Sequence, residues 1–151
     1  FWIEILQNKI YNHQVFTGMF FTAKLNKKLQ PTTVIKSKLL NNSFKLLNDE
    51  DKQHVETDNS EFNYFFSVYS EDEVQARKIL SNSLIEKLAR FRQEANRNIS
   101  LSFVDNMSYI AIEYPEGIFE PNLFRSMLKF EPLRNYFEAI NLMLEIVEEL
   151  K

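Results

Sequence analysis

The chain has 151 residues, a net charge of −3 at pH 7 and no cysteine. This length suits one domain, and the lack of cysteine excludes both a disulfide framework and thiolate chemistry. No apolar run approaches the roughly 20 residues of a membrane-spanning helix. We therefore predict a single domain over residues 1–151. Because the chain begins at Phe1 rather than Met, we expect it to be a fragment of a longer one.

The N-terminal part of the chain has the pattern of three strands. Residues 1–10 and 32–38 are rich in apolar and β-branched residues, which favours strands. Residues 15–25 carry apolar side chains on both faces, so we predict a central strand there, followed by a turn over residues 26–31. Gly18 in this strand predicts a bulge or the close approach of another backbone.

The next stretch, residues 39–59, has the weakest pattern in the chain. We predict a short strand over residues 44–47 and a loop through the acidic residues 49–51. The apolar run Phe65–Tyr69 that follows is too short for a helix and predicts a buried strand.

Two helices are predicted directly after that strand. Ser70 and Glu73 have the spacing of a capping box, and Glu73 and Arg77 are placed for an i,i+4 ion pair. Ser81 offers a second helix cap. The second helix ends near Asn96 and has one apolar face, formed by Leu84, Leu88, Phe91 and Ala95.

A β-hairpin and a C-terminal helix complete the predicted fold. Asp105-Asn106 suits a two-residue turn, which would place Phe103 opposite Ser108, Leu101 opposite Ile110 and Ile99 opposite Ile112 on one face. A short helix is predicted over residues 121–128, and Pro132 fits the first turn of the last helix. The predicted core stripe of that helix is Leu133, Phe137, Ile140, Leu144 and Val147.

Three stretches of the sequence resemble a known family. They are GMFFTAKLNK from Gly18, VYSEDEVQARKILSNSLIEKL from Val68, and ISLSFVDNMSYIAI from Ile99. In this order they are similar to the bacterial domain-of-unknown-function family 3137, over nearly the whole chain. Lys24 stands where the family pattern has an acid. The resemblance implies no activity, because none is established for the family, and it implies membrane-spanning segments upstream of this region.

The charge is unevenly distributed along the chain. Residues 1–55 hold 8 lysines against 4 acidic residues, whereas the rest of the chain is acidic. Lysines on a sheet edge commonly serve only to block edge-to-edge pairing. The alternative is a contact surface for anionic lipid headgroups, for which the candidates are Lys24, Lys27, Lys28, Lys36 and Lys38. Nucleic acid is disfavoured as a partner, because this basic half contains no arginine.

The residues that most enzymes need are scarce. His13 and His54 are the only histidines, and no Gly-rich phosphate loop or nucleophile elbow is present. We assign no catalytic, cofactor-binding or metal-binding residue and no cofactor. A hydrolase that uses Glu113, Glu116 or Glu120 is the most distant alternative.

One pair of residues is a candidate for ligand contact. Tyr69 and Arg77 both lie in the family-like run, and an arginine beside a tyrosine can bind a carboxylate or a phosphate. The structural alternative is that Arg77 pairs with Glu73 while Tyr69 packs with its hydroxyl at the rim.

Together these patterns predict an α+β domain. We expect a mainly antiparallel sheet of about 5–7 strands, with two central helices and a C-terminal helix packed on one face. The leading hypothesis is a non-catalytic binding or interaction domain of a membrane-associated bacterial protein, exposed to the cytoplasm. Its partner would be another protein or a membrane surface. The first alternative is a domain that binds a small ligand or an anionic lipid.

Overall fold

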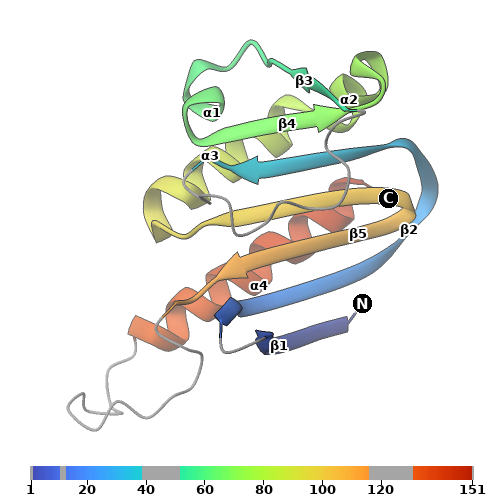
Figure 1. Cartoon of the computed structure of the whole chain (residues 1–151). Coiled ribbons are helices and arrows are strands. Elements are labelled where there is room, and N and C mark those ends of the chain that lie inside the picture. The colour runs from blue at the N-terminus through green and yellow to red at the C-terminus, as the bar shows by residue number, and fades with distance from the viewer. Residues whose placement is uncertain (1, 11–12, 39–51, 116–130, 151) are drawn as a thin grey trace, which may run out of the picture.

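The computed structural model describes residues 2–10, 13–38, 52–115 and 131–150. Within them the domain is α+β, as predicted, with an antiparallel five-stranded sheet and four helices (Figure 1). In chain order the elements are β1 (Trp2–Ile10), β2 (His13–Ser37), β3 (Gln53–Val55), α1 (Ser60–Phe65), β4 (Phe66–Ser70), α2 (Glu73–Ile79), α3 (Asn82–Ala95), β5 (Ile99–Glu113) and α4 (Glu131–Glu149).

Strand β2 is the element on which the sheet is built. Its first half lies between β1, with Thr22 opposite Trp2, and the second half of β5, with Phe21 opposite Ile110. Its second half lies between the first half of β5 and β4, and β4 pairs with β3 on its other side. All these pairs are antiparallel. The predicted central position of residues 15–25 is therefore confirmed.

Strand β5 turns back on itself at Asp105. The backbone N–H of Glu113 donates to the carbonyl oxygen of Asn98 at 2.9 Å, so the two ends of this element lie side by side (Figure 1). Asp105 has a φ of 53°, the left-handed conformation that a tight hairpin turn requires. The predicted reversal is confirmed. However, β structure continues through the turn, so β5 is one bent strand where two separate strands were predicted.

Strand β2 bends around the tip of β5, so the two strands form nested hairpins. Its pairing with β5 changes register on both sides of Leu29, which lies opposite Asp105. Gln30 Nε2 donates to Asp105 Oδ1 at 2.7 Å, which joins the two bends. We predicted that a turn over residues 26–31 would separate two strands. Instead β2 is continuous, because its backbone follows the tip of β5 in an extended conformation.

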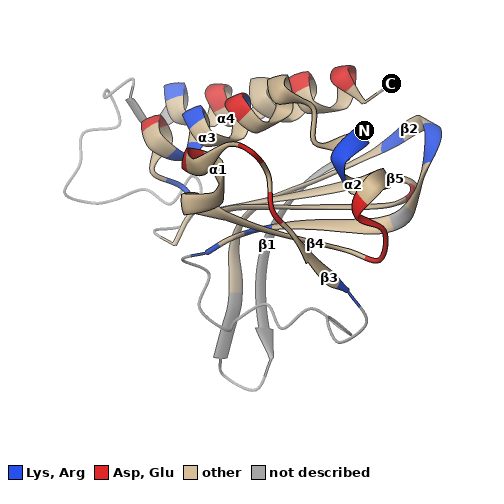
Figure 2. Ribbon diagram, turned by 90° about the horizontal axis from the view of Figure 1, so that it is seen from above, with Lys and Arg blue, Asp and Glu red and all other residues tan. Residues whose placement is uncertain are grey.

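The described helices all lie on one face of the sheet, and the core fills the space between (Figure 2). The six hairpin residues predicted to share a face are all buried there. The sheet contributes Met19, Phe21, Ala23, Leu25, Ile35, Phe66, Val68, Ile99, Leu101, Phe103, Ile110 and Ile112, and the helices contribute Phe62, Ala76, Ile79, Leu84, Leu88, Met143 and Ile146.

The opposite side of the sheet carries no described helix, and we call it the helix-free face. Strand side chains alternate between the two sides, so the residues between the core positions belong to this face. The helix-free face is formed by Phe20, Thr22, Lys24, Val34, Lys36, Tyr69, Ser100, Ser102, Tyr109 and Ala111.

The start of α2 differs from the prediction. Asp72, rather than Ser70, is the N-cap, and its carboxylate accepts hydrogen bonds from the backbone N–H groups of Val74 and Gln75. Ser70 is fully buried in β4, and its hydroxyl lies 3.2 Å from that of Thr33 on β2. The predicted capping box is therefore wrong, because contact with the neighbouring strand holds the Ser70 hydroxyl.

The limits of α3 agree with the prediction. Ser81 is its N-cap and accepts a hydrogen bond from the N–H of Leu84 at 3.0 Å. Asn96 ends the helix in the left-handed conformation, with a φ of 50°. Both signals are short in sequence and need no distant partner, which explains why they could be read correctly.

Helix α1 and strand β3 were not predicted. Asn59 caps α1 by accepting from the N–H of Phe62, and Phe65 is the last residue of this helix rather than the first of a strand. The predicted strand over residues 44–47 and the predicted helix over residues 121–128 lie outside the described residues.

The core-facing side of α4 is rotated from the predicted stripe. Val147 is buried, but Phe137 is 65% exposed and Leu144 is 39% exposed. The core positions are instead Ala139, Leu142, Met143, Ile146 and Leu150. Apolar residues cover more than one face of α4, so their spacing alone did not identify the face that packs on the sheet.

Glu149 connects the end of α4 to the start of α3. Its carboxylate accepts hydrogen bonds from Ser81, from Ser83 at 2.9 Å and from Lys87 at 2.8 Å. Partial burial by itself raises the pKa of Glu149. The bonds from Lys87, Ser81 and Ser83 outweigh burial and hold this pKa below its ordinary value.

Gly18 provides a test of the sheet. A Cβ at this position would lie 2.1 Å from the carbonyl oxygen of Ile112, so a side chain forces the two backbones apart. We expect Gly18→Ala to lower the free energy of unfolding by about 1–3 kcal/mol in urea titrations. Thr22→Ala on the same strand and face is the control and should cost no more than about 1 kcal/mol. Unchanged stability of Gly18→Ala would contradict the close approach.

The Glu149 connection predicts a specific pH dependence. A carboxyl with a lowered pKa in the folded state contributes stability above its unfolded pKa, near 4.5, and loses it as the pH falls through the folded pKa. Glu149→Gln should therefore lower the unfolding free energy by about 1 kcal/mol at pH 7 and by progressively less as the pH falls below about 4. Glu86→Gln, on the exposed side of α3, is the control. If the loss of unfolding free energy were the same at pH 7 and well below pH 4, this role of Glu149 would be contradicted.

Candidate functional site

One end of the helix-free face holds a cluster of aromatic and basic side chains. The Lys36 Nζ lies 5.4 Å from the centre of the Tyr69 ring, and the His54 ring meets the same tyrosine edge-on at 5.6 Å. These residues come from three neighbouring strands, because β4 lies between β2 and β3. Tyr69 is half-buried, so its side chain is still partly open to solvent.

A second aromatic pair lies further across the same face. Phe20 on β2 and Tyr109 on β5 stack with their ring centres 6.3 Å apart. Ser100 lies between this pair and Lys36 in the strand register. Its hydroxyl oxygen is buried and has no hydrogen-bond partner among the described residues. The face therefore combines aromatic surface, small polar groups and lysine.

The five predicted lipid-contact lysines form two groups. Lys24, Lys27 and Lys28 are exposed at the bend of β2 (Figure 2). Lys36 and Lys38 lie near the far end of the strand, where the N–H of Lys38 donates to the carbonyl oxygen of Phe65. Of these five, Lys24 and Lys36 lie on the helix-free face itself. Basic residues therefore stand on both sides of the aromatic pair.

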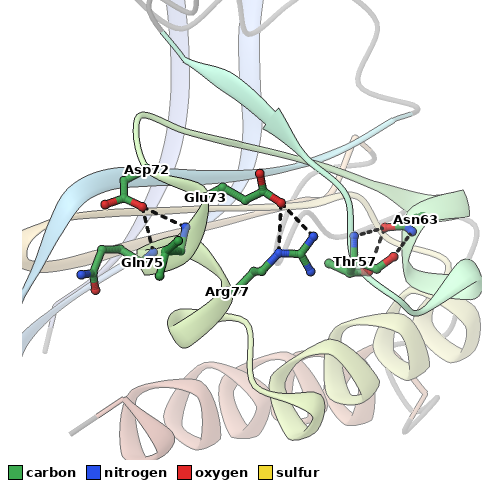
Figure 3. A network of polar contacts seen from close by, with 7 residues as sticks. Thr57, Asn63, Asp72, Glu73, Gln75 and Arg77 are labelled. Atoms are coloured by element: carbon green, nitrogen blue, oxygen red, sulfur yellow. Dashed lines mark hydrogen bonds and ion pairs between the residues drawn. The ribbon is translucent and has the colours of Figure 1, made fainter.

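The structure does not bring Tyr69 and Arg77 together as a shared anion site. Tyr69 belongs to the helix-free face, whereas Arg77 lies on α2, on the helix-covered side. Arg77 pairs with Glu73 at 2.8 Å, as the sequence predicted, and both side chains are about half exposed. Figure 3 shows Arg77 turned to Glu73 at the start of α2, next to the Asp72 cap. An exposed ion pair of this kind adds little to stability.

Beside these residues, hydrogen bonds between Thr57 and Asn63 fix the loop that leads into α1. Asn63 accepts from the Thr57 hydroxyl at 2.8 Å and donates to the Thr57 carbonyl oxygen at 2.6 Å (Figure 3). This loop is therefore fixed by its own side chains, and we assign it a structural role.

A groove of about 250 Å³ runs between α3 and α4. Its floor includes Phe91 and Leu142, and its walls carry charges of both signs. Lys87 in the wall is already held by Glu149 at 2.8 Å and lies 3.9 Å from Glu145. A groove whose charges neutralise one another offers no clear preference for a charged ligand.

Among the described residues, no group of three or more acidic or histidine side chains could hold a metal ion. Glu113 accepts a hydrogen bond from Asn98 Nδ2 at 2.9 Å, whereas Glu116 and Glu120 lie outside the described residues. The side chain of His13 is also outside them, and His54 belongs to the aromatic cluster. The described part of the chain also contains no helix long and apolar enough to cross a membrane.

Two notable residues were missed in the sequence. Arg92 on α3 is 6% exposed, with its guanidinium over the Phe65 ring and a bond of 2.7 Å to Asn96. Its Nε has no partner among the described residues. Arg92 follows Leu88 by four residues, a spacing that places it on the buried face of the helix. No pattern in the sequence indicated Ser100, because the burial of its hydroxyl oxygen depends on how strands distant in sequence pair.

Comparison with known proteins places the chain by sequence alone. No curated protein and no solved structure matches it. The family model described as "Protein of unknown function (DUF3137)" matches residues 14–151, which is nearly the whole chain. The resemblance suggested by the three motifs is confirmed, and the chain belongs to this family.

Proposed function

We propose that the chain is a non-catalytic binding domain whose helix-free face contacts the anionic surface of a membrane. The observation that carries this proposal is the position of Lys36 over Tyr69, on the same face as Lys24 and the Phe20–Tyr109 pair. Aromatic side chains with polar tips suit the headgroup region of a bilayer, and lysines suit its negative charge.

The distribution of charge supports the same orientation. Lys27 and Lys28 extend the basic region beyond the sheet at the bend of β2, whereas α4 carries five glutamates and a single arginine (Figure 2). An anionic surface would therefore attract the β2 side of the domain and repel the α4 side. Each lysine close to such a surface contributes about 1 kcal/mol at physiological ionic strength.

Membership of the family adds a reason to consider membranes. The resemblance implies membrane-spanning segments upstream of this region, which would keep the domain near a bilayer. We accordingly propose a membrane-associated bacterial protein with this domain on the cytoplasmic side. Neither proposal requires a reaction at the site.

Vesicle flotation tests this function. Protein mixed with phosphatidylcholine vesicles that contain phosphatidylserine should float with them at low salt and be released at high salt, because salt screens the lysines. Pure phosphatidylcholine vesicles should not carry it. The triple variant Lys24→Glu, Lys28→Glu, Lys36→Gln should lose flotation while keeping its circular dichroism spectrum.

The matched control changes charges on the helix side. Lys78→Glu on α2 with Arg90→Glu on α3 lowers the net charge by four units at exposed positions, against five for the triple variant, and this variant should float like the original protein. If both variants lose flotation equally, or if the protein never floats, the helix-free face is not a membrane contact.

A further inference from the structure

Helix α4 has a second apolar surface besides the one that packs on the sheet. Phe137 and Leu144 are 65% and 39% exposed, and Ile140 between them is only partly buried. We call these three residues the α4 ridge. Phe137 and Leu144 stand on the side of the helix turned away from the core residues Ala139 and Ile146, and Ile140 lies at the border, where it packs partly against the core.

The spacing of the ridge is that of a helix-pairing seam. Phe137, Ile140 and Leu144 are separated by three and then four residues, as at the a and d positions of a heptad. Exposed aromatic and aliphatic side chains aligned in this way on a stable helix are typical of a docking surface for another helix.

The charges beside the ridge indicate which helix would fit. Arg134 and Glu148 each lie seven residues from Asn141, at equivalent positions along one edge of the ridge. In a parallel pair of α4 helices Arg134 would meet Arg134 and Glu148 would meet Glu148, which is repulsive. In an antiparallel pair centred on Asn141, each Arg134 would meet the Glu148 of the other copy.

We propose that the chain forms an antiparallel homodimer through the α4 ridge. Such an interface is isologous: the same residues contribute on both sides, and each ion pair occurs twice. Arg134 also binds Glu138 of its own helix at 2.7 Å, but its side chain is 73% exposed. A guanidinium has five donors, so it can serve a second carboxylate.

The size of the surface sets the strength of the dimer. Helix α4 has 19 residues and is therefore about 28 Å long, and its ridge offers three apolar side chains. A single helix with three such side chains offers a small contact area, so we expect the dimer to be weak and to depend on concentration. The proposal goes beyond membrane contact, because the ridge and the helix-free face lie on opposite sides of the domain.

Sedimentation equilibrium over a wide range of protein concentrations tests this proposal. The mass should rise from monomer toward dimer, and Phe137→Ser with Leu144→Ser should abolish the rise without unfolding the protein, since both side chains are exposed. Tyr64→Ser removes a 75% exposed aromatic from α1 and is the matched control, which should leave association unchanged. A monomer at every concentration, or association that depends on Tyr64 instead, would overturn the proposal.

Exchange of charges tests the antiparallel arrangement. Arg134→Glu and Glu148→Arg should each weaken dimerisation by about tenfold or more, because each places like charges together. The double variant restores opposite charges and should dimerise like the original protein. If the double variant stays as weak as the single ones, the helices do not pair in this orientation.

Discussion

The fold depends on the close packing of β2 against β5, which leaves no room for a side chain at Gly18. At this point the two backbones approach so closely that a Cβ would clash with the carbonyl oxygen of Ile112. The bend of β5 at Asp105 lies inside the bend of β2. Strand β1 pairs with the first half of β2, and β4 pairs with its second half. Because the described helices all cover one side of this nested pair, the domain has two surfaces of different character. One is aromatic and basic, and the other carries most of the acidic residues that the structure describes.

The sequence was most informative where structure is decided by neighbours in the chain. Ser81 and Asn96 were correctly identified as the limits of α3, because a cap needs only the backbone of the next turn. The reversal at Asp105 was also correct, since two residues suffice to define a tight turn and the apolar pattern fixes its register. The overall α+β class followed from these elements. Short elements with few apolar residues, such as β3, gave no comparable signal.

The sequence was misleading where distant residues decide. Ser70 could have capped α2, but its hydroxyl meets Thr33, 37 residues earlier, so Asp72 takes that role. Tyr69 and Arg77 are close in sequence but lie on different elements, β4 and α2, and Arg77 pairs with Glu73 as the sequence also predicted. The apolar residues of α4 fit more than one stripe, and only contact with the sheet selects the buried one. The cluster of Tyr69, Lys36 and His54 likewise depends on strand order, which no local pattern encodes.

Whether the helix-free face or the helix side meets the membrane can be tested by fluorescence quenching with brominated phosphatidylserine. The chain has a single tryptophan, so Trp2→Phe provides a silent background for Phe20→Trp on the helix-free face and Phe137→Trp on α4. On anionic vesicles we expect the tryptophan at position 20 to be strongly quenched and the one at position 137 not to be quenched. Quenching at position 137, or none at position 20, would contradict it.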